Sequence, residues 1–129
     1  MRIAAAFRAD PYGAVSTGLG VLGGAWHGAV SVAAEALLAE IDAAGEVAPV
    51  VDRHLRSGVR LPGFGHPLYA GGDPRAPALL ERVRRSDGSA LRLAQVDALL
   101  DATGERGLPP PNVDLGIAAL THTLGLPRG

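Results

Sequence analysis

The sequence predicts an all-α fold in which about six helices are joined by glycine- and proline-rich loops. Apolar side chains recur at spacings of three and four residues along most of the chain, which is the pattern of one buried helical face. No segment alternates apolar and polar residues as a half-buried strand would. Of the 129 residues, 47% are hydrophobic and only 19% are charged, which favours a globular domain over a disordered segment.

Three helices are expected in the first half of the chain. The first begins at Pro11, behind Asp10 as the capping residue. The second ends at Gly45, a residue suited to a left-handed C-cap. Its apolar stripe consists of Val30, Ala33, Ala34, Leu37, Leu38 and Ile41. The third is shorter and spans about 47–58, with Pro49 in the first turn, where a helix tolerates proline.

Three more helices are expected after a long loop over residues 59–74, where glycine and proline are frequent and periodicity is lost. Asp73 is the predicted cap of the first of them, and a turn at 87–89 precedes the second, which runs to about Gly104. Residues 109–111 form a stiff Pro-Pro-Pro spacer before the last helix. The apolar stripes are Leu79, Leu80 and Val83, then Leu93, Val96 and Leu100, and finally Val113, Ile117, Leu120 and Leu124.

The composition excludes several classes of chemistry and partner. A formal net charge of -1 gives no electrostatic footprint for nucleic acid or anionic lipid. Lysine is absent, which excludes a Schiff-base mechanism, and the lack of cysteine excludes disulfides and thiolate catalysis. No run approaches the roughly 18 apolar residues of a spanning helix, and the start does not resemble a signal peptide. We expect a soluble, cytoplasmic protein with no nucleic-acid or membrane partner.

Three polar residues, His27, His66 and Asp114, each lie within a run of glycine or proline. Because glycine and proline fix backbone shape, a polar side chain framed by them is held in a defined direction. Two imidazoles and a carboxylate can remove a proton from carbon and stabilise the resulting enolate. Two other interpretations stay open: loop histidines that only cap turns, and a two-histidine, one-carboxylate ligand set for non-haem iron.

Other motifs have simpler interpretations. Residues 18–23 match the dinucleotide-binding fingerprint by pattern, but that site requires a preceding strand. We interpret these glycines as small residues that allow close helix packing. The arginines within 82–85 could bind a phosphate, although a solvated helix face is the favoured interpretation. His54 and His122 have no glycine or proline frame, and we interpret both as structural or exposed.

In this order along the chain, the framed motifs resemble those of the citrate synthase family. The family's first histidine turn is similar to residues 26–29 (WHGA), and the helix before that turn is similar to residues 10–20 (DPYGAVSTGLG). Its second histidine loop is similar to residues 62–69 (PGFGHPLY) with 73–75 (DPR), and its catalytic aspartate motif to 111–114 (PNVD). The resemblance covers almost the whole chain. It implies the all-α, multi-helix small domain of the citrate synthase fold, with long Gly/Pro-rich active-site loops.

The resemblance also implies a reaction, in which acetyl-CoA condenses with oxaloacetate to give citrate and CoA. Asp114 would be the base that removes the methyl proton of acetyl-CoA, and His27 would stabilise the enol by a hydrogen bond to the thioester oxygen. His66 would polarise the ketone of oxaloacetate, and Arg75 would bind one of its carboxylates. No cofactor or metal is implied, because acetyl-CoA is a substrate.

Members of this family are several times longer than 129 residues. The resemblance therefore implies that residues 1–129 are the small, CoA-facing domain with the helix leading into it, without the large domain. We expect the chain to act as a homodimer or with a complementing citrate synthase-like chain, and to show little activity alone. Ala70 stands where the family often has a basic residue, and Trp26 where leucine is usual.

Two alternatives to citrate synthesis follow from the same resemblance. The chain could be a catalytically inert helical dimerisation module derived from the family. It could also be a relative that makes 2-methylcitrate from propionyl-CoA or cleaves citryl-CoA, because the acyl pockets differ by little more than a methylene.

Overall fold

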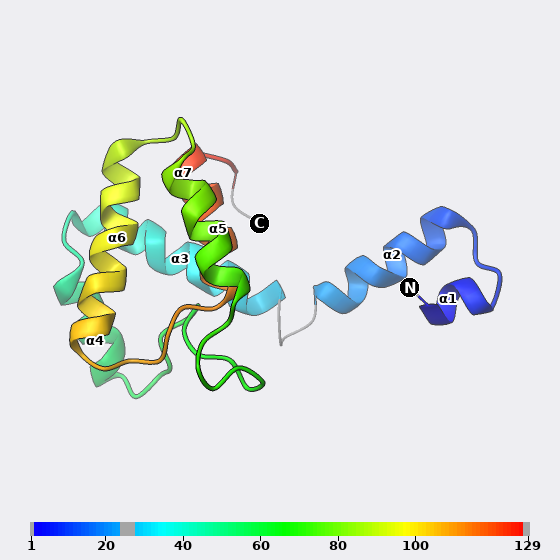
Figure 1. Cartoon of the computed structure of the whole chain (residues 1–129), viewed down its shortest axis with the longest axis horizontal. Coiled ribbons are helices and arrows are strands. Elements are labelled where there is room, and N and C mark those ends of the chain that lie inside the picture. The colour runs from blue at the N-terminus through cyan, green and yellow to red at the C-terminus, as the bar shows by residue number, and fades with distance from the viewer. Residues whose placement is uncertain (1, 24–27, 128–129) are drawn as a thin grey trace. The chain divides into compact units, whose positions relative to one another are not determined.

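The computed structural model describes residues 2–23 and 28–127 and confirms the all-α prediction, since every element in this part of the chain is a helix. The helices, shown in Figure 1, are α1 (Arg2–Ala6), α2 (Pro11–Leu22), α3 (Gly28–Ala44), α4 (Ala48–Arg56), α5 (Arg75–Arg84), α6 (Ala90–Glu105) and α7 (Val113–Leu124). The chain divides into two compact units, residues 1–30 and 31–129.

The first unit contains α1 and α2. The predicted start of α2 is confirmed, because Asp10 Oδ1 accepts hydrogen bonds from the backbone N–H groups of Tyr12 (2.9 Å) and Gly13 (3.0 Å). The fingerprint-like run lies inside this helix and follows helical residues, which removes the strand that dinucleotide binding needs. The close packing expected at its glycines is not found at Gly20, where an added Cβ would meet no atom within 4 Å.

The second unit has one hydrophobic core, to which all five of its helices and the 59–74 loop contribute. Its buried members are Ala34, Leu37, Leu38, Ile41, Val50, Val51, Leu61, Phe64, Leu80, Val83, Val96, Leu99, Leu115, Ala118 and Ala119. The predicted stripes of α3 to α6 are therefore largely confirmed. The predicted C-cap at Gly45 is also present, with a φ of 73°, and Gly125 ends α7 in the same left-handed conformation with a φ of 67°.

The predicted stripe of α7 is only partly confirmed, since Leu120 packs against the core. Ile117 and Leu124 are 41% and 43% exposed, whereas Leu115, Ala118 and Ala119 are fully buried. The reason is close packing against α5, where a Cβ added at Gly116 would lie 2.9 Å from Leu79 Cβ. Small residues bring the two helices together, so the buried face follows alanine and glycine rather than the largest side chains.

The arginines near the end of α5 form the solvated face that was predicted. Arg84 pairs with Asp97 at 2.7 Å and Arg85 with Glu81 at 2.6 Å, and all four side chains are more than 40% exposed. Among the helices of the described residues, none is both long and apolar enough to cross a membrane.

Candidate active site

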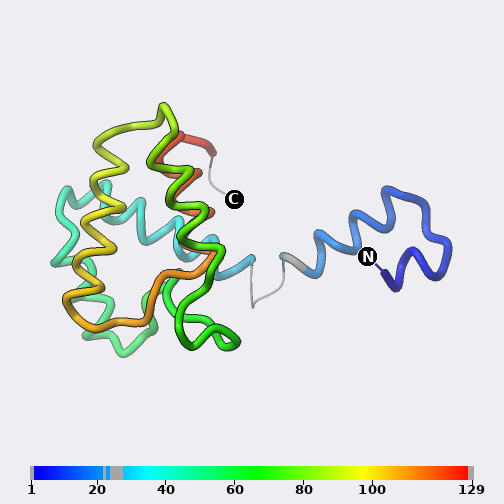
Figure 2. Tube along the Cα trace, in the orientation of Figure 1, coloured from blue at the N-terminus to red at the C-terminus, as the bar shows by residue number. Residues whose placement is uncertain are grey.

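The 59–74 loop is joined to the segment that leads into α7. The Gly65 N–H donates to Pro110 O (2.8 Å), the Asn112 N–H donates to Gly63 O (2.9 Å), and Asn112 Nδ2 donates to Gly65 O (2.9 Å). Figure 2 shows the two segments, green and orange, running side by side. Gly63 has a φ of +84°, and a Cβ there would lie 2.8 Å from Leu115 Cβ, so this close approach requires glycine.

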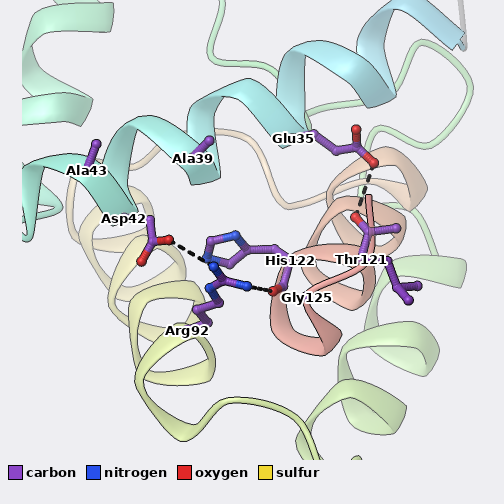
Figure 3. A pocket seen from close by; sticks show the side chains of 9 residues that line it. Glu35, Ala39, Asp42, Ala43, Arg92, Thr121, His122 and Gly125 are labelled. Carbon is purple, nitrogen blue, oxygen red and sulfur yellow. Dashed lines mark hydrogen bonds and ion pairs between the residues drawn. The ribbon is translucent and has the colours of Figure 1, made fainter. Parts of the chain in front are cut away.

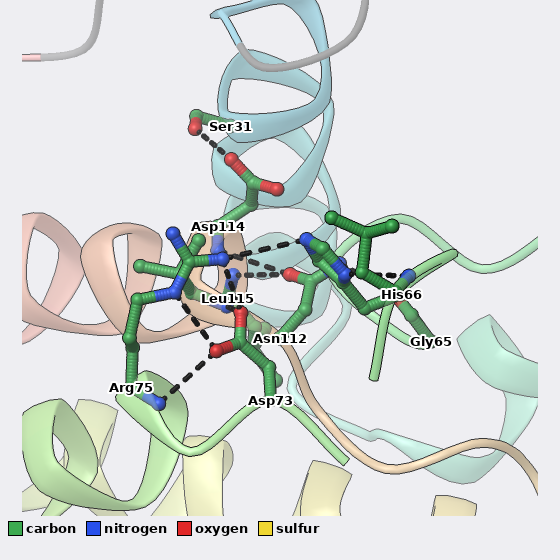
Figure 4. A network of polar contacts seen from close by, with 10 residues as sticks. Ser31, Gly65, His66, Asp73, Arg75, Asn112, Asp114 and Leu115 are labelled. Carbon is green, nitrogen blue, oxygen red and sulfur yellow. Dashed lines mark hydrogen bonds and ion pairs between the residues drawn. The ribbon is translucent and has the colours of Figure 1, made fainter. Parts of the chain in front are cut away.

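Asp114 lies in the first turn of α7, as predicted. Asn112 caps the helix, with its Oδ1 accepting hydrogen bonds from the N–H groups of Asp114 (3.0 Å) and Leu115 (3.3 Å). Asp114 is only 5% exposed, and one of its carboxylate oxygens accepts a hydrogen bond from Ser31 Oγ of α3 at 2.6 Å (Figure 4). Asp114 thus lies buried at the N-terminal end of α7, where the helix dipole is positive.

A second buried carboxylate, Asp73, holds Arg75 in place. Arg75 donates from Nε to Asp73 Oδ1 (2.9 Å) and from Nη2 to Oδ2 (2.8 Å), a two-armed pair in which the Asp73 side chain is fully buried. The Arg75 side-chain hydrogen bonds, reinforced by backbone donors, hold the pKa of Asp73 well below its ordinary value. The same contact raises the pKa of Arg75, whose side chain is 47% exposed.

Asp73 also connects two helix starts. Its Oδ1 accepts from the Arg75 N–H of α5 (3.0 Å), and its Oδ2 accepts from the Val113 N–H of α7 (2.9 Å). The sequence predicts Asp73 as the N-cap residue of α5, and the structure places it one residue before the N-cap. Pro74 is the residue at the N-cap of α5, and since proline has no side-chain acceptor, Asp73 supplies the bond from one residue earlier. One carboxylate therefore orients both Arg75 and the helix that carries Asp114.

His66 lies beside this arginine with a defined tautomer. Its Nδ1 accepts a hydrogen bond from the Leu68 N–H at 3.1 Å, and its Nε2 lies 3.4 Å from Arg75 Nη2. The shorter backbone bond requires an unprotonated Nδ1, so in the neutral ring Nε2 carries the hydrogen. Nε2 and the guanidinium are then both donors, and both are available to an acceptor outside the chain. The His66 ring also packs against the Tyr69 ring, with centroids 4.7 Å apart and the two planes tilted by 38°.

The structure brings His66, Arg75 and Asp114 together at the N-terminal end of α7 (Figure 4). His27, the fourth predicted site residue, lies outside the described residues, as does Trp26. The sequence pattern did not indicate Ser31, which is 83 residues from its partner Asp114. Asn112 could have been found, because an asparagine just before a predicted helix is a strong capping signal.

The two remaining histidines are held by protein partners, as the structural interpretation predicted. His54 Nε2 lies 2.9 Å from Glu40 Oε2, and His122 Nε2 lies 3.4 Å from Gln95 Oε1. Within the described part of the chain, no group of three His, Cys, Asp or Glu side chains is arranged to hold a metal ion.

An open pocket of about 370 Å³ lies between α3, α6 and α7, as Figure 3 shows. Arg92 crosses it, donating to Asp42 Oδ2 (3.3 Å) and to His122 O (3.1 Å), while Thr121 Oγ1 donates to Glu35 (3.1 Å). These contacts tie the three helices together within the second unit.

The fold and the site together define a helical domain in which two joined loops gather a histidine, an arginine and a buried aspartate. The chain belongs to the citrate synthase family, because the family model "Citrate synthase, C-terminal domain" matches residues 1–129.

Known relatives agree with this assignment. The chain is 30% identical over 134 residues to citrate synthase 2 of Bacillus subtilis (strain 168), covering 97% of this chain and 34% of that protein. It is 28% identical over 130 residues to 2-methylcitrate synthase 2 of Corynebacterium glutamicum, covering 98% of this chain and 34% of that protein. The chain thus spans about a third of the length of these relatives.

A solved structure shows the same fold. It is the ternary complex of citrate synthase from the thermophilic archaeon Thermoplasma acidophilum with carboxymethyl coenzyme A and oxaloacetate. It matches with a TM-score of 0.68 and 28% identity, over 97% of this chain and 35% of that one. The predicted fold class, the helical small domain of the citrate synthase fold, is therefore confirmed.

Proposed function

We propose that residues 1–129 form the small, CoA-facing domain and lead-in helix of an enzyme that condenses acetyl-CoA with oxaloacetate to citrate and CoA. The observation that carries the proposal is the cluster of Asp114, His66 and Arg75, built by joined loops in a chain of the citrate synthase family. The relative solved with a CoA analogue and oxaloacetate supports the same substrates.

In the proposed reaction Asp114 is the base. It takes a proton from the methyl group of acetyl-CoA, and His27 stabilises the resulting enol by a hydrogen bond to the thioester oxygen. The cap of α7 holds the backbone of Asp114 and Ser31 holds one of its carboxylate oxygens, and the oxygen that Ser31 does not bind is the one that receives the proton. The enol carbon then attacks the ketone carbon of oxaloacetate.

His66 and Arg75 bind and polarise the second substrate. The Nε2–H of His66 donates a hydrogen bond to the ketone oxygen and supplies the proton as that oxygen becomes the hydroxyl of citryl-CoA. Water then hydrolyses the thioester of citryl-CoA. Arg75 binds a carboxylate of oxaloacetate. Because Asp73 accepts from Nε and from one N–H of Nη2, the donors left for substrate are the Nη1 group and the second N–H of Nη2, which lies beside His66.

We further propose that the reaction needs more than this chain, because the chain spans about a third of the relatives. A homodimer or a complementing citrate synthase-like chain would supply the remaining groups and exclude water from the cleft.

The test is turnover of acetyl-CoA and oxaloacetate, followed by release of the free thiol. The chain is assayed alone and mixed with the part of the B. subtilis relative that the match does not cover. We expect turnover only in the mixture, and its loss by orders of magnitude in Asp114→Ala and His66→Ala. Asp97→Ala, which removes a surface carboxylate, is the matched control. A folded mixture without turnover would reject the proposal and favour the inert interaction module.

A second candidate substrate is propionyl-CoA, which gives 2-methylcitrate. The observation in its favour is the C. glutamicum relative, which is nearly as similar as the citrate synthase from B. subtilis. The ratio of kcat/KM for the two acyl-CoA substrates in the active mixture decides between them, since one methylene changes this ratio by about 10- to 200-fold.

A further inference from the structure

Ser31 makes a contact that the proposed roles do not use. Its Oγ donates to Asp114 Oδ1 at 2.6 Å, a bond between the first turn of α3 and the first turn of α7. A hydroxyl-to-carboxylate distance of about 2.5–2.7 Å is that of the strong, charge-assisted kind. Among the described residues no other group hydrogen-bonds this carboxylate. The neighbouring cap, Asn112, accepts a hydrogen bond only from the backbone N–H of Asp114.

The backbone cap alone does not fix the carboxylate. The side chain of an aspartate can still turn about two bonds, and either oxygen could then face the substrate. The Ser31 bond removes this freedom, since it engages one oxygen and leaves the other pointing away from Ser31, as Figure 4 shows.

The serine is itself held in place by the core. Ala34, Leu37 and Leu38, on the next turns of α3, are fully buried. One turn beyond Ser31, Glu35 accepts a hydrogen bond from Thr121 Oγ1 of α7 at 3.1 Å. Two polar contacts of the same helix pair, four residues apart on α3, thus fix the position from which the Ser31 hydroxyl reaches Asp114.

We propose that Ser31 is a positioning residue for the base. This proposal rests on the proposed function of Asp114 and assigns different tasks to its two carboxylate oxygens. Oδ1 is anchored by Ser31, and Oδ2 accepts the methyl proton of the acyl-CoA. An alternative is that the bond only ties α3 to α7, in which case its loss would change stability without changing the behaviour of the carboxylate.

The first test needs no turnover and uses the 129-residue chain. Three-bond couplings to the two Asp114 β protons report whether the side chain keeps one rotamer. We expect one rotamer in the wild type and in Ser31→Thr, which keeps a hydroxyl, and averaged couplings in Ser31→Ala. Ser86→Ala is the control, because it removes a serine hydroxyl that donates to a carbonyl, Val83 O, at 2.7 Å. A single rotamer in Ser31→Ala would overturn the proposal.

The second test uses the complemented enzyme. Ser31→Ala should lower kcat by about 10- to 100-fold while KM for oxaloacetate stays unchanged, since only the proton-abstraction step loses its geometry. The kinetic isotope effect with methyl-deuterated acetyl-CoA should rise, and Ser31→Thr should restore both values toward the wild type. Wild-type kcat and isotope effect in Ser31→Ala would overturn the proposal. Absence of turnover in the wild-type mixture would reject the proposed function instead, and the couplings would still decide whether Ser31 holds the carboxylate.

Discussion

Replacing Asp73 by asparagine should destabilise the second unit strongly, because the carboxylate is buried and accepts four hydrogen bonds. Three come from Arg75, through Nε, Nη2 and the backbone N–H, and one comes from the Val113 N–H. Asparagine has nearly the same shape but only one acceptor oxygen and no charge. The variant therefore tests the charge and the second oxygen with little change in packing.

The magnitude follows from these contacts. A hydrogen bond to a charged group contributes about 1.5–3 kcal/mol, and asparagine keeps roughly half of the four bonds in neutral form. Arg75 is half exposed, so water replaces part of what its guanidinium loses. We expect a loss of about 3 kcal/mol, which is a large share of the roughly 5–15 kcal/mol that stabilises a domain. The thermal midpoint should fall by about 10–20 °C.

The assay is urea unfolding followed by helical circular dichroism at several pH values. The folded-state pKa of Asp73 lies well below the unfolded value of 3.8, so its stabilisation is fully present above that value and is lost as pH falls through the folded pKa. The difference between wild type and Asp73→Asn should be constant between about pH 5 and 7 and should shrink below about pH 4.

Asp97→Asn is the matched control. Asp97 also accepts two hydrogen bonds from one arginine, Arg84, but both end on Oδ1 and the two side chains are 42% and 44% exposed. An exposed pair contributes less than about 1 kcal/mol, so this variant should remain close to the wild type. Equal losses in the two variants, or a difference at Asp73 that does not change with pH, would refute the reasoning.

Two further predictions concern the helix that carries Asp114. Gly116→Ala should destabilise by about 1–3 kcal/mol, because its Cβ would meet Leu79, whereas Gly104→Ala, where no atom lies within 4 Å, should stabilise by about 0.5–1 kcal/mol. Urea unfolding measures both, and a more stable Gly116→Ala would contradict the packing described. Asn112→Ala should cost about 1–2 kcal/mol in thermal unfolding, since it removes the cap of α7 and the bond to Gly65 O. A cost near zero would show that the cap is replaced.

Features set by neighbouring residues could be predicted from the sequence. Asp10 begins a helix and Gly45 ends one as expected, because a cap depends on a few adjacent residues. The framing of His66 and Asp114 by glycine and proline likewise indicated the two loops. The helix α1 was not predicted, since its five residues offer no cap or stripe.

Features set by distant residues could not be predicted in this way. The buried face of α7 depends on how near α5 approaches at Gly116, and this distance is a property of the packed pair. The contact of Ser31 with Asp114 joins residues 83 positions apart, and no local pattern marks either as the partner of the other. Asp73 was recognised only as a cap, because its bond to Val113 crosses 40 positions.

The joining of the two site loops determines when the site exists during folding. The bond from Asn112 to Gly65 spans 47 positions, and the enclosed stretch contains the whole of α5 and α6. Such a long closure is entropically costly until the enclosed helices have docked. We therefore expect His66 and Asp114 to come together only after the enclosed helices have docked, and the amide hydrogens of Gly65 and Asn112 to exchange with solvent only when the whole unit opens.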